Sequence, residues 1–345
     1  MNNVCIALNV CTYKREEYIR KNLAELKNSR FFNPKDKIYY GRLYIFIVDN
    51  ASELTLPESL FVCLIHNKNT GGSGGFQRGL DEIRASDTQF SHVIFMDDDV
   101  RFQAEALYIL YDFLCVVDEE NQNRPVAGRM FDLDNPDTQW TAAEIWNAGN
   151  ISHIEFQRDI SKPDKNGKQY EYGRVVYDCG ADYGGWWFCC YPMKFAEKND
   201  IMPFFLHCDD VEYALRCGKP PIIIEGVQVW HETWEKRKSP YLLYYDTRNT
   251  LFVNEKYELQ PPANKVFRNW KERISAYHVQ RDWLSEYMVI CGMRDFLRGM
   301  NWLEHLDSEM HHKRITRMKS NRIKNAVAWR WVAFKFKKKY KNKEL

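Results

Sequence analysis

Short apolar runs alternate with helix-length segments over the first 130 residues. The runs cover residues 5–10, 43–48, 61–65 and 92–96, and helical patterns follow at 16–28, around 76–83 and at 104–117. Fully apolar strands that alternate with helices are typical of a parallel sheet with helices on both faces. Hydrophobic residues make up 45% of the 345, which is enough for a packed core and excludes disorder over most of the length. The pattern predicts an α/β fold.

Polar residues gather directly after these strands. Thr12, Asp49, Asn69 and Asp97 each follow one of the apolar runs. In open α/β sheets, ligands bind outside the carboxyl ends of the strands. The sequence therefore predicts a ligand site along this edge of the sheet.

Three consecutive carboxylates, Asp97, Asp98 and Asp99, follow the strand at 92–96. Adjacent carboxylates repel one another, and a divalent cation such as Mg²⁺ or Mn²⁺ is their natural neutraliser. Because these cations commonly take their remaining ligands from phosphates, the motif indicates a nucleotide diphosphate ligand. An acidic turn without a ligand is the alternative.

A glycine-rich segment lies between the third strand and the next helix. Residues 67–79 include Gly71, Gly72, Gly74 and Gly75. Glycines that open a helix allow close approach of a ligand to the backbone, and the helix N-terminus favours anions. The segment matches neither a GxGxxG fingerprint nor a Walker loop, and a flexible turn explains it equally well.

Two further motifs, one acidic and one with a histidine, lie in the second half of the sequence. Asp209, Asp210 and Glu212 stand at a predicted helix start, where they would either cap the helix or supply a general base for a substrate hydroxyl. His231 ends an apolar strand at 222–229 and is either a metal ligand or a polar strand terminus.

A pair of tryptophans, Trp186 and Trp187, follows two glycines. Neighbouring side chains on a strand point to opposite faces, so one ring would pack in the core while the other is free to stack on a sugar. Core packing of both is the alternative. The order of these motifs along the chain, from glycine loop to strand-end His, describes an inverting nucleotide-sugar transferase.

On these residues the chain resembles the GT-A glycosyltransferases of family 2, and among them the bacterial galactofuranosyltransferases, over roughly residues 4–255. The nucleotide-binding half carries residues 12–15, 48–52 and 69–76, which are shared with rhamnosyltransferases. Trp186-Trp187, residues 209–212 and His231-Glu232-Thr233-Trp234 resemble the galactofuranosyltransferase subset. The resemblance implies a Rossmann-like, mostly parallel sheet and a helical C-terminal region.

The resemblance also implies roles for individual residues. Asp97 and Asp99 would reach the metal, Mn²⁺ or Mg²⁺, and the diphosphate, with His231 as a further ligand. Asp210 would be the base, and Glu212 would hold an acceptor hydroxyl or orient the base. If the roles of the two neighbouring acids are reversed, Asp209 would be the base instead. The nucleotide and sugar positions would be Thr12, Arg15, Asp49, Asn69, Gly72, Asp98, Trp187 and Trp234, where Trp187 floors the acceptor site.

The resemblance thus implies transfer of galactofuranose from UDP-galactofuranose to a hydroxyl of a lipid-linked cell-surface glycan. The rival within the class is a rhamnosyltransferase with a deoxythymidine diphosphate sugar donor. Unlike the larger polymerising members, the chain enters the first strand directly, which favours addition of a single residue. We expect a catalytic domain at 1–240, a helical region at 241–311 and a basic tail at 312–345.

The tail differs sharply in charge from the body. From His312 onward there are thirteen Lys or Arg residues and one acid, whereas the first 311 residues carry 36 basic and 46 acidic residues. Written as a helix, the segment has an apolar stripe of Ala326, Trp329, Val332, Ala333 and Phe336, which Trp331 and Phe334 broaden. The cations that flank it are Arg330, Lys335, Lys337, Lys338 and Lys339. The pattern predicts docking on an anionic membrane surface.

Two alternatives to membrane docking remain open. The stripe could pack on the rest of the protein, or the basic, aromatic tail could belong to a nucleic-acid-binding protein, which the acidic body disfavours. No apolar run approaches the ~20 residues of a membrane span, and the N-terminus lacks the basic region of a signal peptide. The ten scattered cysteines fit reduced thiols. We therefore expect a cytoplasmic enzyme, peripheral on the membrane's cytoplasmic face, with no nucleic acid partner.

Overall fold

The computed structural model describes residues 3–233, 239–259 and 263–340. The chain divides into two compact units. Unit 1 contains residues 1–146, 151–202 and 210–236, and unit 2 contains residues 147–150, 203–209 and 237–345. Unit 2 thus combines the predicted helical region with the predicted tail.

The strands are β1 (Ile6–Thr12), β2 (Leu43–Asp49), β3 (Val62–His66), β4 (His92–Asp97), β5 (Arg101–Phe102), β6 (Val126–Asp132), β7 (Thr138–Thr141), β8 (Glu144–Asn147), β9 (Asn150–His153), β10 (Arg158–Asp159), β11 (Val175–Val176), β12 (Cys189–Pro192) and β13 (Ile222–His231). The helices up to the end of β13 are α1 (Glu16–Lys27), the 3-10 turn η1 (Arg30–Phe32), α2 (Gly71–Ala85), α3 (Ala104–Val116), α4 (Met193–Ala196) and α5 (Asp209–Cys217). Unit 2 contributes α6 (Pro240–Lys256), α7 (Ala263–Val279), α8 (Trp283–Phe296), α9 (Met300–Glu304), α10 (Ser308–Thr316) and α11 (Arg322–Tyr340).

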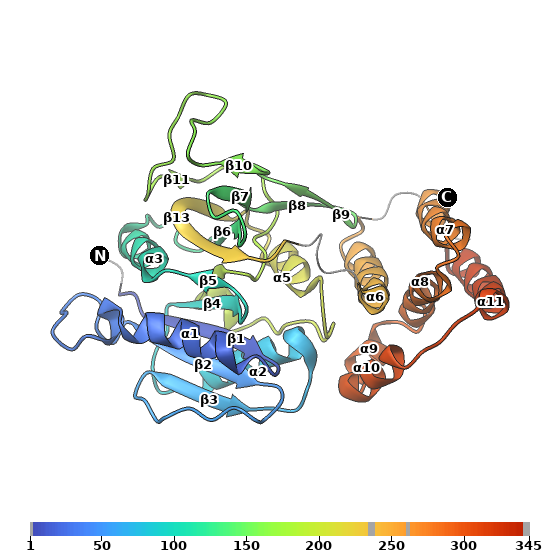
Figure 1. Ribbon diagram of the computed structural model, residues 1–345, viewed down its shortest axis with the longest axis horizontal. Coiled ribbons are helices and arrows are strands. Elements are labelled where there is room, and N and C mark those ends of the chain that lie inside the picture. Colours follow the sequence, from blue (N-terminus) through green and yellow to red (C-terminus); the bar gives the residue numbers. More distant parts are fainter. Residues whose placement is uncertain (1–2, 234–238, 260–262, 341–345) are drawn as a thin grey trace. The chain divides into compact units, whose positions relative to one another are not determined.

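The main sheet of unit 1 has the order β10-β7-β6-β12-β4-β1-β2-β3 (Figure 1). The long pairings of β1 with β2 and β4, of β2 with β3 and of β13 with β6 are parallel. β12 is antiparallel to its neighbours β4 and β6. The predicted α/β class with a mostly parallel sheet and a helical C-terminal region is therefore confirmed.

Helices cover both faces of this sheet because side chains alternate along each strand. Ile6 and Leu8 of β1 belong to a buried cluster with residues of α1 and α3. Ala7, between them, belongs to a second cluster with Phe76 of α2 and Tyr213 of α5. The two clusters hold the parallel strands between two helical layers, which leaves the strand ends to carry the polar side chains.

The glycine-rich segment opens a helix as predicted, because the first turns of α2 contain the glycines. The helix begins at Gly71, and Gly75 and Gly79 face Cys11 and Asn9 of β1. A Cβ on Gly75 would lie 2.1 Å from Cys11 Sγ, and one on Gly79 would lie 2.1 Å from Asn9 Oδ1. Close packing of the helix on the sheet therefore explains these two glycines without a ligand.

We expect the Gly75→Ala variant to be destabilised by about 1–3 kcal/mol, because the added methyl group overpacks the contact with Cys11. An alanine in an unconstrained helix would instead stabilise by roughly 0.5–1 kcal/mol. Urea denaturation monitored by circular dichroism measures the difference. A Gly75→Ala variant as stable as the wild type would contradict the close packing.

In unit 2, α8 packs against α6, α7 and α11. On α11, Val332 and Phe336 are buried, and Trp329 stacks on Phe267 of α7 with ring centroids 5.5 Å apart. Most of the predicted apolar stripe is therefore covered by unit 2 itself, so the prediction that these residues face a membrane is wrong. Trp331 and Phe334, predicted to broaden the stripe, are exposed. None of the helices among the described residues is long and apolar enough to cross a membrane.

Candidate active site

Three side chains that can bind a metal meet at one end of the sheet. One ligand atom from each of Asp97, Asp99 and His231 lies within 4.8 Å of the others. His231 Nε2 is 3.1 Å from Asp99 Oδ1 and 3.8 Å from Asp97 Oδ2. The sequence proposed these three residues as one set, and the structure brings them together. Two carboxylates and an imidazole form a donor set that suits Mn²⁺ as well as Mg²⁺.

The chain between β4 and β5 explains why His231 reaches carboxylates more than 130 positions away. β4 ends at Asp97, and β5 begins at Arg101 after a short turn. β5 pairs with the end of β13, where Arg101 is opposite Trp230. The next residue of β13, His231, therefore lies beside Asp99, and the hydrogen bond between them follows from this register.

Asp98 has different surroundings from its two neighbours. Its Oδ2 accepts a hydrogen bond from Thr12 Oγ1 at 2.7 Å, and its Oδ1 accepts one from Arg15 at 2.8 Å. Burial raises the pKa of Asp98, while the charge of Arg15 acts in the opposite direction. Arg15 also pairs with Asp99 at 2.9 Å. Because Asp98 is buried, it organises the site rather than presenting a surface to a nucleotide.

The sequence reasoning missed one residue that fixes this turn. Asn22 of α1 donates hydrogen bonds to the carbonyl oxygens of Asp98 and Val100, at 3.2 and 3.1 Å. Its position gave a signal, because it is an amide beside Ile19 and Leu23 on the buried face of an amphipathic helix. A polar residue on such a face needs a hydrogen-bond partner.

Asp49 and Asn69, which were predicted to bind the nucleotide, accept hydrogen bonds from the backbone after β2 and at the start of α2. Asp49, at the end of β2, is buried, and its oxygens accept hydrogen bonds from the backbone N–H groups of residues 51, 53 and 54. Asn69 Oδ1 accepts one from the Gly71 N–H at 3.1 Å, and Gly72 lies in the first turn of α2. The observed bonds of Asp49 and Asn69 are thus structural.

Asp210 lies in the first turn of α5, on the same side of β4 as Asp97. Tyr213, one turn further along α5, packs edge-on against Phe95 with ring centroids 5.7 Å apart. Phe95 and Asp97 are two residues apart on β4 and therefore point to the same face. Asp210 is half-buried, whereas its neighbour Asp209 is buried.

The other two acids of α5 have different settings. Glu212 is fully buried and accepts a hydrogen bond from Arg216 at 2.6 Å. It therefore offers no surface to an acceptor hydroxyl in this structure, and an orienting role is the one that remains. Asp209 is buried and belongs by its contacts to unit 2, whereas Asp210 begins the last segment of unit 1.

The expectation of a tryptophan open to a sugar ring is not met. Trp187 is 3% exposed, and its indole N–H donates to the Gly128 carbonyl oxygen at 2.8 Å. Trp186 stacks on Phe95 at 4.4 Å between centroids. Both rings are core residues because Trp187 lies in a turn before β12 rather than alternating along a strand. Trp234, predicted to line the acceptor site, lies outside the described residues.

Comparison with known proteins identifies sequence relatives. Residues 8–178 match the family model described as Glycosyl transferase family 2. Galactofuranosyltransferase GlfT2 of Mycobacterium tuberculosis is 28% identical over 203 residues, which cover 55% of this chain and 31% of that protein. GlfT2 of Mycolicibacterium smegmatis is 26% identical over 266 residues, covering 71% and 40%. The chain thus spans about a third to two fifths of the length of these relatives.

Solved structures resemble the chain more weakly. The mannosyltransferase PcManGT from Pyrobaculum calidifontis, solved with GDP-Man and Mn²⁺, has a TM-score of 0.45 and 11% identity, covering 100% of this chain and 84% of that one. GalNAc-T7, solved with UDP, GalNAc and Mn²⁺, has a TM-score of 0.47 and 10% identity, covering 98% and 58%.

Proposed function

Because the chain carries a glycosyl transferase family 2 domain, we propose that it is a metal-dependent, inverting galactofuranosyltransferase. The donor would be UDP-galactofuranose and the acceptor a hydroxyl of a cell-surface glycan, lipid-linked during its assembly. The cluster of Asp97, Asp99 and His231 supports the transferase proposal, since it combines two carboxylates at the end of β4 with a histidine at the end of β13 as possible metal ligands. The sequence similarity to the two GlfT2 proteins supports the choice of sugar.

Different residues of the site would bind the metal ion and the phosphates of the donor. Asp97, Asp99 and His231 would hold a divalent cation, which when bound offsets the charge that develops on the leaving diphosphate. Arg15 holds Asp98 and Asp99 in place through its ion pairs of 2.8 and 2.9 Å. Its guanidinium is about half exposed and can also reach a phosphate oxygen.

The acceptor is activated from the α5 side. In the proposed reaction, the Asp210 carboxylate removes the proton of the acceptor hydroxyl as that oxygen attacks the anomeric carbon. A carbon–oxygen bond to the acceptor forms on the face opposite the breaking bond to the diphosphate, which inverts the anomeric configuration. The polar edge formed by β1, β4 and β13 positions the donor for this attack.

The donor is tested by comparing the thermal stabilisation and slow hydrolysis of three nucleotide sugars in the presence of Mn²⁺. We expect UDP-galactofuranose to stabilise the protein most and to be hydrolysed, because ligand binding raises the free energy of unfolding. UDP-galactopyranose, its ring isomer, is the matched control for the uridine and diphosphate. Preference for dTDP-rhamnose would instead support the rhamnosyltransferase alternative.

A further inference from the structure

The outward face of α11 carries a second apolar stripe, distinct from the buried one. Ile323, Val327, Trp331 and Phe334 are 78%, 65%, 47% and 65% exposed. Their spacings of four, four and three residues place them on one side of the helix. Val332 and Phe336, on the opposite side, are buried in unit 2, so the packing of the helix leaves the second stripe uncovered within that unit.

Cations border this stripe along its length. Helical geometry places Lys324 and Lys335 on one flank and Arg330 and Lys337 on the other, and all four are exposed. Lys338 lies within the stripe, four residues after Phe334. Lys339, on the buried side, pairs with Glu255 at 2.9 Å, whereas Arg330, Lys335, Lys337 and Lys338 make no ion pair with any described residue. The exposed face is therefore both apolar and strongly positive.

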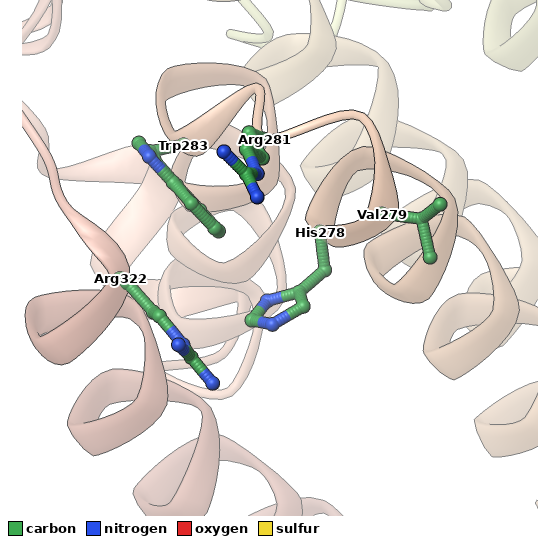
Figure 2. A pocket seen from close by; sticks show the side chains of 5 residues that line it. All are labelled: His278, Val279, Arg281, Trp283 and Arg322. Carbon is green, nitrogen blue, oxygen red and sulfur yellow. The ribbon is translucent and has the colours of Figure 1, made fainter.

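An open hollow lies at the N-terminal end of the same helix. It has a volume of about 550 Å³ and is lined by His278, Val279, Arg281, Trp283 and Arg322. Figure 2 shows His278 of α7 and Arg322 of α11 extending toward it. Arg322 directly precedes Ile323, so the stripe begins beside a hollow that is lined by two arginines and by His278, whose Nδ1 lies 3.1 Å from the buried Glu286. This arrangement suits an anionic headgroup.

The chemistry of the face favours one kind of partner. A second copy meeting it through a two-fold axis would place like charges opposite each other. Nucleic acid would be contacted by the cations and by Trp331 or Phe334, but it gains nothing from aliphatic Ile323 and Val327. A lipid surface uses all of these groups, since the apolar side chains enter the acyl boundary and the cations meet the phosphates.

We propose that the exposed stripe of α11 docks unit 2 on an anionic lipid bilayer, with the helix lying in the plane of the interface. Ile323, Val327, Trp331 and Phe334 would insert, and Lys324, Arg330, Lys335, Lys337 and Lys338 would contact the headgroups. The proposal is independent of the sugar donor. It would make the protein peripheral to a membrane, where the lipid-linked acceptor of the proposed function would be concentrated near it.

The test is co-sedimentation of the full chain with phosphatidylcholine vesicles, with and without phosphatidylglycerol, at low and high salt. We expect binding only to the anionic vesicles and weakening by salt. The double variant Trp331→Ser, Phe334→Ser should lower the partition coefficient by about 10-fold or more, because two apolar anchors are lost. Lys335→Ala with Lys338→Ala should lower it by about 10-fold at low salt.

Met310→Ser is the matched control, because Met310 is 68% exposed on α10 and lies outside the stripe. It should bind vesicles like the wild type, and all variants should keep the wild-type melting temperature. The proposal is overturned if the intact protein ignores anionic vesicles at low salt, or if the double variant binds them unchanged. A monomer produced from a dimer by the double variant, without vesicle binding by either protein, would assign the stripe to a second copy instead.

Discussion

Replacement of Asp99 by alanine is expected to abolish transfer while the fold survives. Asp99 shares the proposed cation with Asp97 and His231, and its loss removes a ligand and one of the two partners of Arg15. Stabilisation of charge by a bound cation is worth several kcal/mol in the transition state, so turnover should fall by about 10³-fold or more. Asp97→Ala should behave alike. Turnover is measured with UDP-galactofuranose and a glycan acceptor.

Chelation separates the loss of a metal from the loss of an acidic side chain. Excess EDTA should inactivate the wild type, and added Mn²⁺ or Mg²⁺ should restore transfer. Asp178→Ala is the matched control, because its side chain is 94% exposed in another part of unit 1 and its replacement should leave transfer unchanged. Full activity in excess chelator would show that the cluster holds no catalytic metal.

The second large effect concerns Asp210. Asp210→Asn keeps the shape of the side chain and can still accept the hydrogen bond from the Val211 N–H, observed at 2.8 Å. The amide cannot accept a proton from the acceptor hydroxyl, so transfer should fall by about 10²-fold or more. Donor binding, measured by calorimetry in the presence of Mn²⁺, should persist because the donor residues are untouched.

Asp209→Asn is the comparison variant for this experiment. Asp209 is buried and groups with unit 2, so we expect a milder loss of transfer than for Asp210→Asn. Near-normal transfer by the Asp210→Asn variant would show that another group is the base. A larger loss for Asp209→Asn than for Asp210→Asn would mean that the two acids have exchanged roles.

Much of the fold was predictable because it depends on local pattern. The apolar runs predicted β1, β2, β3, β4 and β13 to within a few residues, and the helical patterns predicted α1 and α3. Buried strands of a parallel sheet need apolar side chains on both faces, which leaves an unbroken apolar run in the sequence. The short strands β5, β10 and β11 leave no such trace, since each is two residues long.

The residues of the candidate metal site could be predicted from the sequence, but the strand pairing that brings them together could not. Three successive acids at a strand end and a histidine at another are visible in the chain as residue types. The pairing of β5 with β13 that joins them is a long-range contact between two short segments. Asn22 and Thr12 act on Asp98 through such contacts as well, and no spacing rule relates them.

Side-chain orientation was decided by tertiary packing in three places. Trp187 is in the core because its turn brings the indole N–H to the Gly128 carbonyl oxygen. Gly75 faces β1, where an added Cβ would lie 2.1 Å from Cys11 Sγ. α11 has two apolar stripes, and either could face the interior of unit 2. The stripe that includes Trp329 and Phe336 is covered by α7 and α8.

The sequence by itself thus determined the fold class, the family and the acids and histidine at the strand ends, because these depend on residue type and order. Tertiary structure alone decided which aromatic rings are buried, which face of α11 is exposed and which strand brings His231 to Asp99. A helix with apolar residues on two faces satisfies the local pattern in either orientation. Only the neighbouring helices, by burying one face, leave the other to solvent.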